Sequence, residues 1–434
     1  MIIQCLIIQM NFILSKIMKF NFKIITIISI IIWVILQVIL VYSYGVTSID
    51  GGGDPDSYRY LALQAINNSS LYPNDLNYHD NFIFAPGYVN YIILVYSIFG
   101  SFKAVLYSQI ILNLFIIILL YNFTSKLFNS RIGYISIWLY LLLTSNFLSP
   151  IFGYTELLFI LLSLLSLYLI LSNKWYYIIL SGVVLALANW VRPLAIAWMF
   201  SVMICFFLNK SNYKKYICYI VGYIVMIMII GTITKVNFND FNYSSTTGGW
   251  NLIMGANDNC TGNYNDEVFK EGNLGYISEN DKKIFSYKQQ DSIYMARSVN
   301  WILENPVKYI SFIPMKVKEL FLYDNQYDMS GDSITSQNKF VYLLSKITFS
   351  NKIARVLGKL LYWSVLLLSL LSILYIKDNR ILLLQGIILI TTFMTLITVG
   401  HPRYHQIFMP YILISSSFII EKITSKIKSY KRNV

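Results

Sequence analysis

Long apolar stretches without a charge constrain the fold of this chain more than any other feature of its sequence. Ten such runs contain only one Asp, Glu, Lys or Arg residue, Glu156, which lies at the very edge of its run. About 20 apolar residues in a helix cross the roughly 30 Å hydrocarbon core of a bilayer, and a charge at the helix centre costs about 2.5–3.5 kcal/mol. We therefore predict an all-α polytopic membrane protein with about ten transmembrane helices. The runs cover residues 24–44, 104–121, 132–148, 155–171, 175–190, 194–208, 216–234, 360–376, 381–399 and 405–420.

The charge composition also favours a chain that is surrounded by lipid. Charged residues make up 13% of the sequence, against about 25% in soluble domains. The net charge is +13, but Lys and Arg lie mostly in short loops and tails, where they mark the cytoplasmic side of a membrane protein. We expect membrane lipids as neighbours and no nucleic acid as a partner.

Residues 82–99 form an eleventh apolar run, and the side on which each loop lies depends on whether this run crosses the membrane. If it does not cross, sixteen Lys and Arg residues of the short loops and tails lie inside and four lie outside. If it crosses, about six lie inside and fourteen outside. The positive-inside rule favours the first arrangement, and Pro86-Gly87 suits an interfacial or broken helix. We predict an interfacial or re-entrant segment.

This topology places the candidate reactive residues together on the extracytoplasmic face. They are Asp50, Asp54, Asp56, Glu156, Arg192, His401, Arg403 and His405. The Ile-, Asn-, Lys- and Tyr-rich composition indicates an AT-rich genome. We therefore expect an integral protein of a bacterial plasma membrane, with its active site on the outer face.

Five parts follow one another along the chain. They are a cytoplasmic N-terminus (1–23, with Met18 as an alternative start), a transmembrane block (24–234) with a catalytic first external loop (45–103), an extracytoplasmic loop or lid segment (235–356), C-terminal transmembrane helices (357–420) and a basic cytoplasmic tail (421–434). We call 235–356 the polar segment. Its stretches 246–250 and 255–259 resemble turns, 280–304 favours helix, and 306–322 predicts an amphipathic helix at the membrane surface. The segment is thus expected to be small and α-rich.

The first external loop carries the acidic pair Asp54 and Asp56. One carboxylate of such a pair can accept a proton from a hydroxyl nucleophile, while its neighbour binds a cation or the substrate. The alternative is a solvated Gly/Asp turn that caps a helix starting near Ser57. A lone pair of this spacing does not decide between the two.

Basic and imidazole groups occur at two other predicted outer helix ends. Arg192-Pro193 interrupts two apolar runs, so Arg192 either reaches the headgroups as a long side chain or binds a phosphate. Arg403 is a further candidate for phosphate binding, and it lies between His401 and His405. Two histidines alone more often have structural roles than bind a metal, so we predict no metal site there. Glu156 fits an acidic residue in the first turn of a helix.

Short motifs in a fixed order resemble the GT-C class of integral-membrane glycosyltransferases, nearest to glycosyltransferase family 39, which includes protein mannosyltransferases and lipid A aminoarabinose transferases. The matching stretches are Asp54-Pro55-Asp56-Ser57-Tyr58, Ala85-Pro86-Gly87-Tyr88, Lys126-Leu127-Phe128-Asn129-Ser130-Arg131, Thr155-Glu156-Leu157-Leu158-Phe159, Ala188-Asn189-Trp190-Val191-Arg192-Pro193, Asn251-Leu252-Ile253-Met254-Gly255-Ala256-Asn257, Trp301-Ile302-Leu303-Glu304-Asn305-Pro306 and Pro402-Arg403-Tyr404 followed by Pro410. Together they extend over nearly the whole chain. Pro55 departs from the pattern, because many relatives carry an acid directly after the first Asp. It is therefore open whether Asp54 or Asp56 is the base.

The resemblance implies transfer of one sugar from a polyprenyl-phosphate donor to an acceptor hydroxyl of a protein, lipid or cell-surface glycan, with inversion. It implies Asp54 as general base with Asp56 second, and Arg403 and Arg192 as ligands of the donor phosphate. Supporting or substrate-binding roles fall to Tyr58, Glu156, His401, Tyr404 and His405. The resemblance assigns no firm cofactor, and Mg²⁺ or Mn²⁺ at Asp54 and Asp56 is a candidate.

Two other classes of protein remain as alternatives. A polymerase or ligase of surface polysaccharide shares large external loops and outer-face Arg and His residues, but it does not predict an Asp motif after the first helix. A lipid-linked sugar flippase or transporter would place charged residues at mid-membrane, and this sequence has none there.

Overall fold

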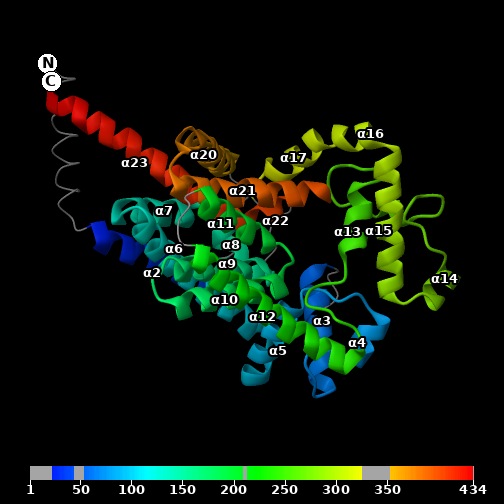
Figure 1. Cartoon of the computed structure of the whole chain (residues 1–434). Helices are drawn as coiled ribbons and strands as arrows, with labels where there is room; N and C mark the ends of the chain where they lie inside the picture. The colour runs from blue at the N-terminus through cyan, green and yellow to red at the C-terminus, as the bar shows by residue number, and fades with distance from the viewer. Residues whose placement is uncertain (1–21, 44–52, 209–212, 325–351, 434) are drawn as a thin grey trace.

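The computed structural model describes residues 22–43, 53–208, 213–324 and 352–433, and these residues form helices joined by loops, with no strand among them (Figure 1). The all-α prediction is thus confirmed. The predicted N-terminus (1–23) lies almost wholly outside the described residues, as do 325–351 of the polar segment.

Each predicted apolar run is helical, and the runs 132–148, 360–376 and 405–420 are each divided between two or more helices. These helices are α2 (Phe22–Ser43), α6 (Phe102–Leu127), α7 (Ser130–Leu142), α8 (Thr144–Phe152), α9 (Glu156–Ile170), α10 (Trp175–Val191), α11 (Ile196–Leu208), α12 (Tyr213–Phe238), α20 (Lys352–Leu371) with η3 (Ser372–Tyr375), α21 (Asn379–Ile397), and α22 (Pro402–His405), η4 (Gln406–Phe408) and α23 (Met409–Asn433). Among the described residues, six helical stretches are long and apolar enough to cross a membrane, or seven if the bent pair α7 and α8 is one span. The helices α9, α10 and α11 are apolar but shorter. The count of ten spans therefore stays a prediction.

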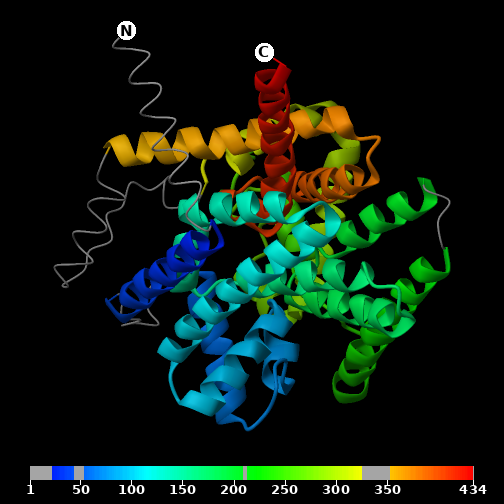
Figure 2. The same cartoon turned by 90° about the vertical axis from the view of Figure 1, so that its left-hand side faces the viewer.

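The apolar helices pack side by side into one bundle (Figures 1 and 2). Helix α10 lies between α9 and α12, α6 contacts α7 and α9, and α21 and α23 close the bundle against α11, α20 and α7. The outer sides of these helices remain apolar and exposed, as along Ile24, Ile28 and Ile31 of α2. Apolar side chains on the outside as well as the inside are expected of helices that lipid surrounds.

The run at 132–148 is not the straight helix that the sequence predicts. It bends by 60° at Leu143, between α7 and α8. Asp324, at the end of the described polar segment, accepts hydrogen bonds from the backbone N–H and the hydroxyl of Ser145 at 2.9 and 2.8 Å. A carboxylate at this position satisfies the otherwise unpaired N–H groups of a new helix start. A partner 179 residues away stabilises the bend, so local sequence could not predict it.

The eleventh run folds as α5 (Pro86–Phe99), which begins at Pro86 and packs against α3 (Asp54–Asn67), α6 and α10. Its 14 residues extend about 21 Å, less than the roughly 30 Å of hydrocarbon. This length agrees with an interfacial or re-entrant segment, which stays a prediction. Short helix α4 (Asp75–Asp80) follows α3.

The described part of the polar segment consists of short helices joined by loops, and it gathers at one end of the bundle (Figure 1). Its elements are α13 (Gly248–Gly255), η1 (Asp266–Phe269), α14 (Glu279–Ile284), α15 (Tyr287–Glu304), α16 (Pro306–Ser311) and α17 (Ile313–Phe321). The turn prediction for 246–250 is wrong at Gly248, Gly249 and Trp250, which begin α13. Packing of α13 against α15 overrides the helix-breaking tendency of the two glycines. The amphipathic helix predicted from Pro306 does begin there, but it breaks at Phe312.

A tight junction joins the polar segment to the loop between α21 and α22. The Gly400 N–H donates to the Gly262 carbonyl at 2.7 Å, and a Cβ atom at position 400 would lie 1.9 Å from the carbonyl oxygen of Lys316. Only glycine allows this approach of two backbones. Lys316 lies within the junction and is 1% exposed as a whole residue, and its ammonium donates to the Leu396 carbonyl at 3.1 Å. The junction therefore fixes the backbone that leads into α22.

Candidate active site

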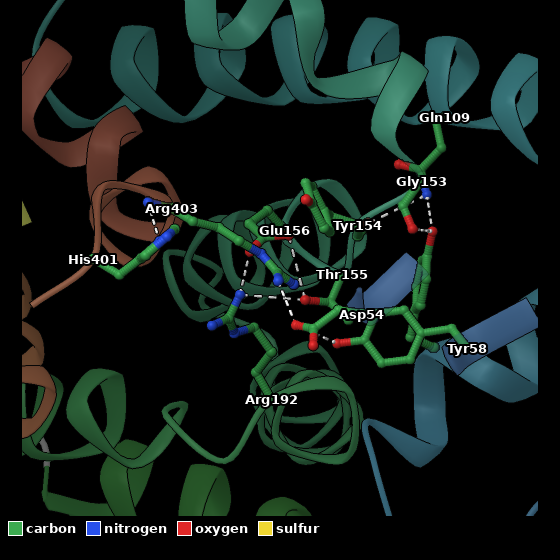
Figure 3. Close-up of polar contacts among 11 residues, drawn as sticks. Asp54, Tyr58, Gln109, Gly153, Tyr154, Thr155, Glu156, Arg192, His401 and Arg403 are labelled. Atoms are coloured by element: carbon green, nitrogen blue, oxygen red, sulfur yellow. Dashed lines mark hydrogen bonds and ion pairs between the residues drawn. The ribbon is translucent and has the colours of Figure 1, made fainter. Parts of the chain in front are cut away.

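Asp54 is the first residue of α3 and is held in place by two partners. The Arg403 Nη1 donates to its Oδ2 at 2.5 Å, and the Tyr58 hydroxyl lies 3.4 Å from the same oxygen. Asp54 and Tyr58 are one helical turn apart and therefore share a face of α3. The last apolar helical stretch, which begins at Pro402, and the start of α3 thus meet at this carboxylate (Figure 3).

Glu156 lies behind this contact, at the start of α9, and binds two guanidinium groups. It forms ion pairs with Arg192 and with Arg403 Nε. Glu156 is 2% exposed and Arg403 7% exposed, so these charges are shielded from water. We call Asp54, Glu156, Arg192 and Arg403 the ionic cluster. It holds two carboxylates and two guanidinium groups, so its formal charge is zero.

Neighbouring groups fix both arginines in orientation. Arg192 caps the C-terminal end of α10 with an extended backbone ahead of Pro193, and its Nη1 donates to the Thr155 hydroxyl at 3.2 Å. The guanidinium carbon of Arg403 lies 3.9 Å from the ring centroid of Tyr154, and that of Arg192 lies 5.3 Å from the ring of Tyr404. Cation–π contacts of this kind strengthen when they are shielded from water.

The loop between α8 and α9 is held by a chain of hydrogen bonds that ends beside Tyr58. The Tyr88 hydroxyl donates to the Gly153 carbonyl at 2.5 Å and accepts from the Gln109 amide at 2.8 Å. The Tyr88 ring packs edge-on against Tyr58, with centroids 5.3 Å apart. The positions of Glu156 and Tyr58 are thereby coupled through Tyr88.

His401 orients Arg403 through the backbone. Its Nδ1 accepts the N–H of Arg403 at 3.2 Å and so caps the start of α22. Burial, together with the positive charge of Arg403, lowers the pKa of His401 to about 4. The imidazole is therefore neutral near pH 7, the state in which Nδ1 can accept a hydrogen bond.

The electrostatics of the cluster keep Asp54 ionised. Burial raises the pKa of this carboxyl, but the charge of Arg403 and its hydrogen bond lower it further, and the pKa ends below its usual value. Burial and the charge of Asp54 raise the pKa of Tyr58, so its hydroxyl stays protonated.

A pocket of about 250 Å³ opens over the ionic cluster. Asp54, Arg192 and Arg403 form its charged part. Apolar residues come from the α10–α11 break and the end of α21, and uncharged polar and aromatic residues come from the polar segment. The lining comprises Asp54, Tyr58, Phe84, Ala85, Thr155, Val191, Arg192, Pro193, Leu194, Ser245, Thr247, Gly248, Trp250, Asn251, Tyr264, Met394, Thr395, Thr398, Arg403 and Tyr404.

Four of the predicted site residues do not line this pocket, namely Asp56, Glu156, His401 and His405. Glu156 and His401 nevertheless contact the arginines of the pocket. Asp56 forms an ion pair with Arg59 on α3, because residues two apart on a helix point to different sides. His405 is fully buried, with Nδ1 2.7 Å from the Leu320 carbonyl and Nε2 3.4 Å from the Tyr362 hydroxyl. The structure therefore brings Asp54, Tyr58, Glu156, Arg192, His401, Arg403 and Tyr404 together and leaves Asp56 and His405 to the side.

Several residues that line the pocket or contact its arginines were not singled out from the sequence as site residues. Tyr154 and Thr155 adjoin Glu156 in the predicted helix start, and their contacts with arginines could have been sought there. Trp250 and Tyr264 lie in the polar segment, where only the rarity of Trp among polar residues gave a signal. Their place opposite Asp54 depends on tertiary structure.

No family model matches the sequence, and no curated protein matches it. Among the similar solved structures is the apo oligosaccharyltransferase of Archaeoglobus fulgidus, with a TM-score of 0.52 and 13% identity, covering 94% of this chain and 51% of that one. The form tethered to an acceptor peptide with the NVT sequon has a TM-score of 0.50 and 15% identity, with 93% and 50% covered. The archaeal oligosaccharyltransferase AglB with an inhibitory peptide and a dolichol-phosphate has a TM-score of 0.50 and 13% identity, with 94% and 51% covered.

The chain shares the fold of this oligosaccharyltransferase. It spans about half the length of that protein. With its apolar helices, the shared fold makes this chain an integral membrane protein.

The residues present give little support to a divalent cation at Asp54 and Asp56. The two carboxylates bind Arg403 and Arg59, respectively, and their side chains leave different sides of α3. Within the described ranges, no group of three or more His, Cys, Asp or Glu side chains is placed to hold a metal ion. The position beside Asp54 that a cation would take is filled by the guanidinium of Arg403.

Proposed function

We propose that the protein is a membrane glycosyltransferase of the GT-C type, similar to glycosyltransferase family 39. It transfers a sugar from a polyprenyl-phosphate donor to an acceptor hydroxyl on the extracytoplasmic face of a bacterial plasma membrane. The observation that carries the proposal is the contact of Asp54 with Arg403 at the base of a pocket that joins apolar, charged and uncharged polar walls. A ligand with a lipid tail, a phosphate and a sugar matches these three kinds of surface.

Arg192 is the residue that binds the donor phosphate in this proposal. It reaches Glu156 and Thr155 through a single nitrogen, Nη1. Its Nε and Nη2 make no hydrogen bond or ion pair with the described residues. A guanidinium has five N–H donors in total, so several of them remain available. Arg192 lines the pocket, so these donors can bind phosphate oxygens in the two-pronged manner that is typical of Arg.

The zero charge of the ionic cluster matches the charge changes of the proposed reaction. A prenyl-phosphate sugar carries one negative charge, and the prenyl phosphate that leaves carries two. When Asp54 accepts the acceptor proton, the cluster changes from zero to one positive charge. The cluster therefore gains positive charge as the leaving phosphate gains negative charge, which is the condition for electrostatic stabilisation of the transition state.

The bonds that form and break are the following. The acceptor oxygen attacks C1 of the sugar from the side opposite the phosphate, and its proton passes to Asp54 Oδ. The bond between C1 and the phosphate oxygen breaks, and both of its electrons leave with the phosphate. Attack from the opposite side inverts the configuration at C1. The acceptor is a hydroxyl of a protein, lipid or glycan.

The comparisons support the lipid-linked donor. The similar archaeal oligosaccharyltransferase has been solved with a dolichol-phosphate and with an acceptor peptide. The experiment that tests the proposal uses purified protein in liposomes, radiolabelled polyprenyl-phosphate monosaccharides and cell-surface extract as acceptor. We expect transfer by the wild type, none by Asp54→Asn, and wild-type transfer by Asp258→Asn, whose carboxylate pairs with Lys308 at the surface.

Two outcomes would contradict the proposal. If no monosaccharide donor is used but a lipid-linked oligosaccharide is, the polymerase or ligase alternative holds instead. If Asp54→Asn transfers sugar at the wild-type rate and Asp56→Asn does not, the base is assigned to the wrong residue.

A further inference from the structure

The polar segment supplies one wall of the pocket, and this wall carries no charge. It consists of Ser245, Thr247, Gly248, Trp250, Asn251 and Tyr264. The rings of Trp250 and Tyr264 meet edge-on with centroids 5.4 Å apart. Tyr264 is 42% exposed, and it lines the same pocket as Asp54 and Tyr404. Two aromatic rings thus face the pocket that contains the ionic cluster.

Trp250 is held rigidly at this wall. Its backbone N–H donates to Asp291 of α15 at 2.8 Å, so a carboxylate from another helix satisfies the start of α13. A Cβ atom at Gly249 would lie 2.0 Å from the Asp291 carbonyl oxygen, so glycine allows α13 and α15 to touch. The Trp250 ring also stacks on Phe269, with centroids 5.8 Å apart and planes 13° apart.

Rigid aromatic rings beside hydroxyl and amide groups bind sugars well. The face of an aromatic ring is electronegative, and the C–H groups on one side of a sugar ring are weakly positive. Hydroxyl and amide side chains such as Thr247 and Asn251 can exchange hydrogen bonds with sugar hydroxyls without a net charge. The pocket volume of about 250 Å³ lies below the roughly 300–1,000 Å³ of sites for drug-sized ligands, so it suits one sugar unit.

We infer that Trp250 and Tyr264 form the binding site for the transferred sugar, and that this sugar is a single uncharged unit. The inference rests on the proposed function, in which Arg192 binds the phosphate of the donor. It adds the residues that bind the sugar of the same donor. Asp291 is a positioning residue, since it acts only by holding Trp250.

Two short-chain donor analogues separate sugar binding from phosphate binding. One is a prenyl-phosphate glucose, and the other is the same prenyl phosphate without a sugar. Their affinities are measured by calorimetry on the purified full chain in detergent. We expect Trp250→Ala to bind the glucose-bearing analogue about tenfold more weakly and the sugar-free analogue as the wild type does. Trp250→Phe keeps an aromatic face and should recover most of the loss.

Matched controls address folding and specificity. Trp175→Ala removes a tryptophan that is 66% exposed, at the start of α10, and should leave both affinities unchanged. Arg192→Gln should weaken both analogues equally. An analogue with a cationic amino sugar should bind the wild type more weakly than the glucose analogue does.

The results distinguish a failure of this inference from a failure of the proposed function. If the wild type binds the glucose analogue and Trp250→Ala binds it equally well, the inference is wrong and the proposed function stands. If Trp250→Ala weakens both analogues alike, Trp250 does not recognise the sugar and the inference is also wrong. Equal affinity for the amino-sugar analogue would overturn the assignment of an uncharged sugar. If the wild type binds neither analogue, the proposed function fails as well.

Discussion

The carboxylate of Glu156 pairs with Arg403, which lies 247 positions away in the sequence, in a contact that is almost fully shielded from water. Glu156 also pairs with Arg192, so a single acid at the start of α9 fixes both arginines of the pocket. Asp54 then binds the outer side of Arg403. The order of these contacts makes Glu156 the residue on which the geometry of the cluster depends.

Replacing Glu156 should destabilise the protein more than any exposed acidic residue. Glu156→Gln leaves two buried guanidinium groups without their shared counter-charge, and breaking such a buried pair costs about 3–5 kcal/mol. We expect a clear fall in the midpoint of thermal unfolding in detergent. Glu421→Gln removes an ion pair with the half-exposed Arg131 and should cost at most about 1 kcal/mol. Equal shifts for both variants would show that Glu156 does not hold the cluster together.

Replacing Asp54 should slow the proposed reaction strongly without unfolding the protein. Loss of a general base lowers the rate about 10²–10⁴-fold, so kcat of Asp54→Asn should fall by that factor. The pKa of this carboxyl lies below its usual value, so the base is ionised well below neutral pH. The wild-type kcat/KM should therefore stay flat from about pH 7 to about pH 5. A decline centred near pH 6 would contradict Asp54 as the titrating base.

Acid should weaken the start of α22 through His401. Its pKa is lowered from 6.5 to about 4 in the folded protein, so between these two values the unfolded chain binds more protons than the folded chain. Stability should therefore fall as the pH drops from about 6.5 to about 4. His401→Asn retains a cap acceptor without this titration, so its unfolding midpoint should depend less on pH in that window. Identical pH dependence for the variant and the wild type would exclude His401 as the cause.

Alkali should strengthen the junction at Lys316, whereas acid weakens the start of α22. Burial lowers the pKa of this ammonium to about 8, while the unfolded chain keeps the ordinary value of about 10.4. Between these values the unfolded chain binds more protons, so the contribution of Lys316 should raise stability as the pH increases from about 8 to about 10. Lys316→Met should lose this rise when melting curves are compared. If the variant keeps it, the titrating group lies elsewhere.

The predicted topology can be tested by chemical labelling in intact cells. In a chain whose four native cysteines are replaced by alanine, Asp258→Cys should react with a membrane-impermeant maleimide and Lys126→Cys should not. Both side chains are exposed, so the difference reports the side of the membrane rather than burial. Labelling of position 126 from outside would reverse the orientation and place the pocket on the cytoplasmic side.

The helices of the bundle could be predicted from sequence, because an apolar run without charges has few alternatives to a helix in lipid. The bend at Leu143 could not, since a distant carboxylate, Asp324, supports the second helix. The start of α13 was also predicted wrongly. Gly248 and Gly249 favour a turn by local propensity, but Gly249 is needed where α13 touches α15.

In the candidate site too, local sequence predicted some residues, and the others depend on contacts between distant parts of the chain. Asp54, Arg192 and Arg403 were selected from their places beside predicted helix ends, and all three line one pocket. Asp56 was selected by its closeness to Asp54 in sequence, yet the helix that begins at Asp54 turns the Asp56 side chain toward Arg59. Trp250 and Tyr264 could not be placed, because only the fold of the polar segment brings them opposite α3.

The contact of Gly400 with the polar segment has a consequence for building hybrid proteins. A Cβ atom at position 400 would meet the carbonyl oxygen of Lys316 at 1.9 Å, so the two backbones interlock without intervening side chains. Residues 239–324 could not be exchanged as a cassette for the same region of another protein unless the graft reproduced both surfaces of this contact. Recombination within the chain should succeed where crossover points keep the polar segment and the α21–α22 loop from one parent, and fail where they separate them.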